Sequence, residues 1–278
     1  MVRQPRGGVA KDSQNKGMTM RVDFRDVPTV IADESSATGQ SLHRILDQLG
    51  FRALDHVETM DALRSRITRS EVALLIANAA MAGGDILKLI RAVRRNEMGG
   101  QPFVPVITLI GQPDASTTRS IIDSGSDLIF ALPISHGRVE TGLKTLLAGR
   151  KPFVVTSDYV GPDRRSGARG DWQEVPLIEV PNPLRRWATG SIDEPSAKKV
   201  LEAINLQRVQ RQAVQILYLA DLIVAHFSGG ESDGKVRSHL KSLQTAATEA
   251  NGLAVGTKYR NQVVLCELVG TAARDIEI

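Results

Sequence analysis

The stretch "LLIANAAMAGGDILKLI", residues 74–90, begins with four apolar residues, turns on small residues and then continues with the spacing of an amphipathic helix. Ile86, Leu89 and Ile90 fall on one face of such a helix. The stretch therefore predicts a buried strand at 71–77 and a helix at 83–96. Asn78 follows the apolar run directly, so we expect its amide at the carboxyl end of that strand.

The same alternation of strand and helix extends through residues 21–149. Strand patterns occur at 29–33, 51–56, 71–77, 103–110 and 127–132, and helical patterns follow them at 38–50, 59–67, 83–96, 114–125 and 138–147. The strands are apolar along their length, which is typical of a parallel sheet covered by helices on both faces. We therefore predict an α/β domain with a doubly wound, five-stranded parallel sheet.

The remaining sequence divides into three further segments, as expected for a chain of 278 residues, which is long enough for about two domains. Residues 1–20 hold few apolar groups and are predicted to be a disordered tail. Residues 150–190 form a linker in which Pro, Gly and charge prevent any long regular element. Because this linker also carries Phe153, Tyr159 and Trp187, we expect part of it to pack on a domain or on a second subunit. Residues 191–278 are predicted to be all helical.

The longest helical pattern spans residues 194–227, and two shorter helices are predicted at 236–250 and 259–274. In the long pattern, apolar residues recur at alternating steps of three and four, which is typical of a coiled coil or a tightly packed bundle. This seam predicts a homodimer or a helical interaction module. Its members are Leu206, Val209, Ala213, Ile216, Ala220, Ile223 and Phe227.

Charge and cysteine content narrow the function classes. The single cysteine, Cys266, excludes an internal disulfide and favours a reducing, cytoplasmic location. The pI is about 9.3, but the surplus positive charge lies in residues 1–20 and 150–190, and residues 191–278 hold ten basic and ten acidic residues. Without a basic domain, nucleic-acid binding is unsupported. No signal peptide or membrane-spanning stretch is predicted.

Residues 27–147 resemble the receiver domain of two-component response regulators. The match has no gaps over "VIADESSATGQSLHRILDQLGF", residues 30–51, which is similar to a receiver's first strand, acidic pair and first helix. The resemblance implies a flavodoxin-like (CheY-like) fold and a phosphorelay role. It also implies a site of two acidic residues that hold Mg²⁺, an acceptor Asp, a Ser or Thr, and a Lys before a Pro. Here these positions are Asp33 with Glu34, Asn78, Ile110, and Leu132 before Pro133.

Three of these substitutions remove chemistry that phosphoryl transfer needs. An amide at Asn78 is a far poorer nucleophile than a carboxylate and brings no charge for Mg²⁺. Ile110 removes a hydroxyl, and Leu132 removes an ammonium group. We therefore predict a pseudo-receiver that accepts no phosphate, has no catalytic residue and is not an enzyme. No cofactor is predicted, and Asp33 with Glu34 would bind Mg²⁺ weakly, or would only cap and solvate the strand end.

The sequence leaves several functions open. The first is a signalling protein that acts through protein partners and dimerisation. The second is a transcription or antitermination regulator with a helical nucleic-acid-binding output, although its charge balance speaks against that. The third is a phosphorelay transferase that uses His226, which lies near the end of the long helix with Gly229 and Gly230 after it. Arg165 and Arg169 have the spacing found in cyclic-dinucleotide-binding PilZ domains, and arginine pairs suit phosphates. The barrel strands and the downstream polar signature of that family are absent, so a solvated, charged linker turn is the favoured explanation.

Overall fold

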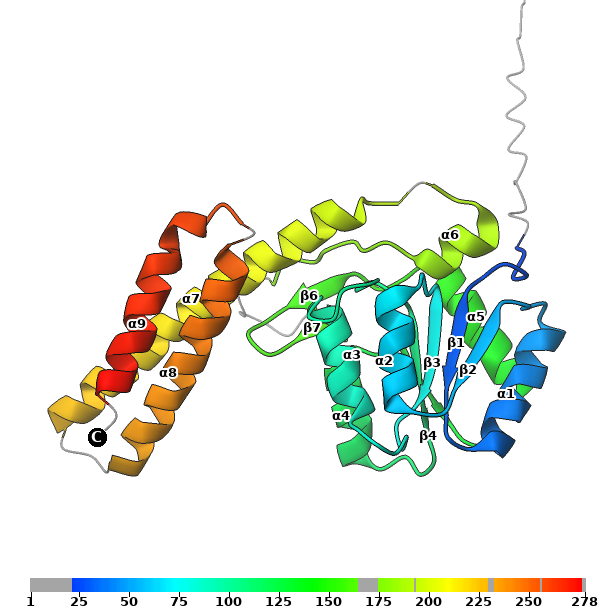
Figure 1. The fold of residues 1–278 in the computed structure, drawn as a ribbon, viewed down its shortest axis with the longest axis horizontal. Helices are drawn as coiled ribbons and strands as arrows, with labels where there is room; N and C mark the ends of the chain where they lie inside the picture. The colour runs from blue at the N-terminus through cyan, green and yellow to red at the C-terminus, as the bar shows by residue number, and fades with distance from the viewer. Residues whose placement is uncertain (1–21, 165–174, 193, 230–232, 256, 277–278) are drawn as a thin grey trace, which may run out of the picture.

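The computed structural model describes residues 22–164, 175–192, 194–229, 233–255 and 257–276. The predicted tail at 1–20 lies outside them. A parallel sheet in the order β2-β1-β3-β4-β5 forms the centre of the N-terminal domain (Figure 1). Its strands are β1 (Thr29–Ala32), β2 (Leu54–Val57), β3 (Leu74–Asn78), β4 (Val106–Ile110) and β5 (Leu128–Ala131). This confirms the predicted doubly wound fold, whose order is that of the flavodoxin-like class.

Helices cover both faces of the sheet, as the apolar strands require. The helices α1 (Ser36–Gln48) and α5 (His136–Ala148) share one core with Ile31, Ile76 and Leu109 of the strands. The helices α2 (Met60–Arg69) and α3 (Ile86–Arg94) share the other, and α4 (Ala115–Ser124) packs beside α3. Each of these helices begins at a Ser, Thr or Asp whose side chain accepts a backbone N–H of the first turn, which fixes the helix start.

The linker segment contains short elements that pack on the N-terminal domain. The strands β6 (Phe153–Val155) and β7 (Val160–Pro162) form an antiparallel hairpin, and α6 (Pro183–Thr189) packs against α5. Phe153 and Val160 are buried with Phe103 in a core that also includes Ile204 of the long helix α7 (Ala197–Gly229). The linker therefore joins the two larger regions through a common apolar core.

A buried ionic cluster holds this linker to the amino-terminal edge of the sheet. The Asp127 carboxylate, just before β5, accepts hydrogen bonds from Arg94 Nη2 at 2.8 Å and Arg150 Nε at 2.7 Å, and all three side chains are buried. Burial alone would raise the pKa of Asp127, but the charges of Arg150 and Arg94 hold it below its usual range. Burial lowers the pKa of Arg94 to about 10, against the opposing effect of Asp127.

The C-terminal region consists of α7 (Ala197–Gly229), α8 (Asp233–Ala254), the 3₁₀ turn η1 (Arg260–Gln262) and α9 (Val263–Asp275). The start of α7 lies against the N-terminal domain, where Arg208 Nη1 donates to the Arg95 carbonyl at 3.2 Å. Farther along, α7 leads away from the sheet, and α8 packs along both α7 and α9 (Figure 1). Leu219 and Ile223 of α7 are buried against Leu240 of α8.

Candidate functional site at the carboxyl edge of the sheet

The residues that the receiver resemblance singles out lie together at the carboxyl edge of the sheet. Ala32 is level with Ala77 in the β1–β3 pairing, so Asp33 and Asn78 follow on adjacent strands. Ile110 ends β4, and the Leu132 N–H donates to its carbonyl at 2.8 Å. In a sheet of this strand order, the direction of winding reverses between β1 and β3, which is where doubly wound folds bind their ligands.

Asp33 and Asn78 interact directly. The Asp33 carboxylate is fully buried, and its Oδ2 accepts a hydrogen bond from Asn78 Nδ2 at 3.3 Å. Its other oxygen, Oδ1, accepts the Ser35 backbone N–H at 2.7 Å. Asn78 Oδ1 accepts the Ala80 N–H at 3.0 Å, so the amide is oriented from both ends. The uncharged Asn78 amide therefore lies next to the Asp33 carboxylate, at a position where a second carboxylate would repel that of Asp33.

Two further side chains border this pair. Glu34 is exposed, and its Oε2 accepts the Ala82 N–H at 3.2 Å, which ties the end of β1 to the loop after β3. His56 of β2 places Nε2 2.9 Å from the Asp33 carbonyl oxygen. Because a carbonyl only accepts hydrogen bonds, the His56 Nε2 carries the proton in this contact. The sequence did not single out His56, whose position on a strand next to β1 is the only signal that could have found it.

The other two predicted positions present hydrocarbon. Ile110 is buried at the end of β4, and Leu132 is half-buried against the core shared by α1 and α5. Pro133 follows through a cis peptide bond and is exposed. Hydrocarbon side chains at these positions can neither donate a hydrogen bond to a phosphoryl oxygen nor neutralise its charge.

The chemistry open to this edge is therefore limited. Phosphoryl transfer to a carboxylate requires a nucleophilic oxygen, a metal and a fixed cation or hydroxyl. Asp33 and Glu34 supply oxygen ligands, but in the described part of the chain no three His, Cys, Asp or Glu side chains are grouped so that they could hold a metal ion. Mg²⁺ prefers several oxygen ligands in near-octahedral geometry. Two carboxylates with different hydrogen-bond partners fit such an ion poorly.

The remaining candidates from the sequence lie elsewhere. His226 is on α7, with Nδ1 2.6 Å from the Leu222 carbonyl oxygen and its ring edge-on to His239 at 5.2 Å between centroids. It lies in the last turn of α7, and α7 leads away from the sheet (Figure 1). Arg165 and Arg169 lie outside the described residues.

The structure divides the predicted seam between two faces of α7. Val209 and Ile223 are buried and Ile216 is half-buried, whereas Ala213 and Phe227 are exposed; Leu206 and Ala220 are intermediate. The packing of α7 on α8 therefore explains only part of the seam within one chain.

Part of this chain is similar to solved structures of known proteins at low sequence identity. No protein-family model and no curated protein matches the chain. Solved structures to which it is similar include a response regulator of Burkholderia pseudomallei with a phosphorylated aspartic acid, calcium ion and citrate (17% identity, 46% of this chain, 76% of that chain, TM-score 0.36). They also include chemotaxis protein CheY4 of Vibrio cholerae (14% identity, 42% of this chain, 95% of that chain, TM-score 0.38). A third is the receiver domain of a signal transduction histidine kinase from Syntrophus aciditrophicus (24% identity, 43% of this chain, 89% of that chain, TM-score 0.37).

Many of the matching structures are thus CheY-like receiver domains. The assignment of the fold is based on the observed strand order and register.

Among the described residues, no helix is both long and apolar enough to cross a membrane.

Proposed function

We propose that this chain is a two-component-type signalling protein whose receiver-like domain accepts no phosphoryl group. It has no catalytic residue of its own, and it acts by binding protein partners and by forming a homodimer. The domain then serves as a folded platform for the linker and the helical region, in place of a switch driven by phosphate. Asn78 is the observation that carries this proposal.

Three features support the proposal. The Asn78 amide lies where an acceptor carboxylate would be needed, and it donates to the buried Asp33. Ile110 is a buried alkane at the second position. Leu132 packs toward the core at the third position and brings no charge to the edge of the sheet. Each change alone removes one component of phosphoryl transfer, and together they remove the nucleophile, the hydroxyl and the cation.

The helical region supports the interaction role. Residues 191–278 have no net charge surplus, and apolar side chains protrude from α7 and α9, with Leu217 of α7 67% and Leu268 of α9 60% exposed. Exposed apolar surface of this kind marks sites of protein association. A surface that bound nucleic acid would instead be rich in Lys and Arg.

Incubation of the full chain with acetyl phosphate and Mg²⁺ tests the proposal. We expect the intact mass to stay unchanged. A phosphoryl adduct that is destroyed by alkali would place phosphate on a carboxylate and contradict the proposal. An adduct that is destroyed by acid but survives alkali would indicate phosphohistidine, and its loss in His226→Gln would establish the transferase alternative instead.

A further inference from the structure

The helix α7 carries two apolar faces, although α8 covers only one of them. The inner face includes Val209, Ile216, Leu219 and Ile223 and packs within the chain. The outer face follows the same alternating steps, shifted by one residue: Ala213, Leu217, Ala220, Val224 and Phe227. Of this outer face, Leu217, Val224 and Phe227 are 60–67% exposed. A shift of one residue turns a helix by about 100°, so the outer face lies beside the inner one. A helix with two apolar faces normally has a neighbour on each.

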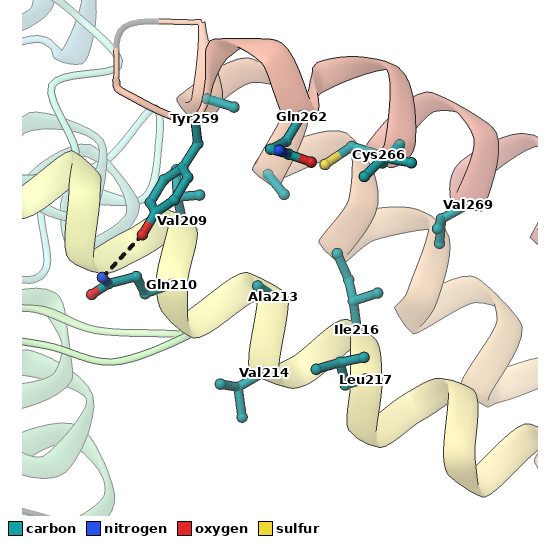
Figure 2. Close-up of a pocket in the computed structure, with 13 residues that line it drawn as sticks. Val209, Gln210, Ala213, Val214, Ile216, Leu217, Tyr259, Gln262, Cys266 and Val269 are labelled. Atoms are coloured by element: carbon teal, nitrogen blue, oxygen red, sulfur yellow. Dashed lines mark hydrogen bonds between the residues drawn. The ribbon is translucent and has the colours of Figure 1, made fainter.

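A groove of about 550 Å³ runs between α7 and α9 next to this outer face (Figure 2). Ala213 and Ile216 of α7, Ala250 and Ala254 of α8, and Leu265 and Val269 of α9 line it. At one end, Gln210 Nε2 donates to the Tyr259 hydroxyl at 3.4 Å. The floor is built from small side chains of α8, so the groove has the shape that receives a ridge of larger apolar side chains.

The area that protrudes here matches that of a stable interface. On α7, Val214 is more than half exposed together with Leu217, Val224 and Phe227. On α9, Val264, Leu265 and Leu268 are exposed to a similar extent. At about 100 Å² for each of these seven side chains, the surface is roughly 700 Å². That is about the area that each partner buries in a standard protein–protein interface.

We propose that a second copy of this chain occupies the groove, with the outer face of α7 from each copy lying between α7 and α9 of the other. This proposal rests on the proposed interaction function and names its partner and surface. A two-fold axis makes the contact isologous, so the groove and the protruding face of both copies are covered at once. Between residues 212 and 227 of α7, Asp221 is the one acidic or basic residue besides His226, and interface centres are depleted of charge in the same way.

The order of side chains along α7 fits an antiparallel crossing at Ala220. A two-fold axis at this residue brings Phe227 of one copy level with Ala213 of the other, a large side chain opposite a small one. It also brings Val224 level with Ile216 in the groove. Ala220 lies on Ala220 at the crossing, where small side chains let two helices approach closely.

The oligomeric mass of the full chain in solution tests this arrangement. By light scattering at micromolar concentration we expect twice the chain mass of 30.1 kDa, and the chain mass itself for the double variant Leu217→Glu/Val224→Glu. The control is Ile192→Glu, because Ile192 is 91% exposed and lies outside the outer face. This control should remain a dimer. A monomeric unaltered chain, or a double variant that still forms dimers, would overturn the proposal.

Cys266 provides a second readout, because it lines the groove and is the single cysteine of the chain. We expect its labelling by a maleimide to slow as protein concentration rises, and to be independent of concentration in the double variant. Labelling at equal rates in both proteins would contradict the arrangement. Unchanged circular dichroism spectra of the variants exclude misfolding as the cause. A monomeric chain would also remove the homodimer from the proposed function. It leaves untouched the acetyl phosphate result, which tests the receiver-like domain, so the two claims can fail separately.

Discussion

Replacement of Asp127 by Asn tests whether the buried ionic cluster holds the linker to the sheet. Asp127 accepts two hydrogen bonds from Arg150, at 2.7 and 3.1 Å, one from Arg94 at 2.8 Å and one from the Val106 N–H at 2.8 Å. Asn keeps the volume and one acceptor oxygen. Asn removes the negative charge that the guanidinium groups of Arg94 and Arg150 both contact.

The magnitude follows from the burial of all three groups. Arg94 is fully buried, and the side chains of Arg150 and Asp127 are each 3% exposed. Removing one partner of a buried ion pair leaves an uncompensated charge and costs about 3–5 kcal/mol. Since Asp127 serves two arginines, we expect a loss of about 4 kcal/mol in the free energy of unfolding.

Urea denaturation followed by circular dichroism and tryptophan fluorescence measures this loss. The matched control is Glu140→Gln, which removes an exposed contact to Lys144 at 2.7 Å; we expect no measurable change from it. A loss for Asp127→Asn that is as small as in the control would refute the view that this cluster stabilises the fold.

The difference in stability between the unaltered chain and Asp127→Asn should depend on pH. The folded-state pKa of Asp127 is lowered, so its contribution to stability is present above the unfolded pKa of about 3.9 and is lost as pH falls through the folded value. The stabilities of the unaltered chain and Asp127→Asn should therefore converge in acid. A difference that grows toward low pH would contradict the assigned direction of the shift.

Three further outcomes are expected. Asn78→Asp should bind Mg²⁺ more tightly than the unaltered chain in calorimetric titration, because it adds a carboxylate ligand; equal affinities would contradict this account of the site. Ile216→Glu should lower the free energy of unfolding by about 2 kcal/mol or more, because the Ile216 side chain packs between helices. Leu217→Glu should leave the stability of the single chain nearly unchanged. A larger loss for Leu217→Glu than for Ile216→Glu in urea would mean that the two faces of α7 are assigned wrongly. Gly142→Ala should cost about 1–3 kcal/mol, because a new Cβ would lie 2.3 Å from Phe130 Cζ, and Gly137→Ala, with nothing within 4 Å, is the control that should cost nothing.

Much of the N-terminal domain could be predicted because its strands are continuous apolar runs and its helices begin at strong capping residues. The apolar residues 74–77 correctly predicted the third strand and placed Asn78 at its carboxyl end. The predicted second strand, at 51–56, was displaced: β2 spans Leu54–Val57. Residues 51–53, which include the exposed Arg52, form the connection after α1 instead.

The ionic cluster and the division of α7 into two faces could not be read from the sequence alone. Arg94, Asp127 and Arg150 are separated by 33 and 23 residues, and charge counting does not pair residues so far apart. An arginine one position after the buried Val93 was the only local signal. For α7, steps of three and four fit both faces, so the predicted seam combined Val209, Ile216 and Ile223 with Ala213 and Phe227.

The most direct test of the central claim compares the unaltered chain with the triple variant Asn78→Asp/Ile110→Thr/Leu132→Lys. Both are incubated with acetyl phosphate and Mg²⁺, and their intact masses are measured. We predict a phosphoryl adduct on the triple variant and none on the unaltered chain. An alkali-labile adduct on the unaltered chain would contradict the account, because it would mean that an edge without the acceptor carboxylate, the hydroxyl and the ammonium group still receives phosphate.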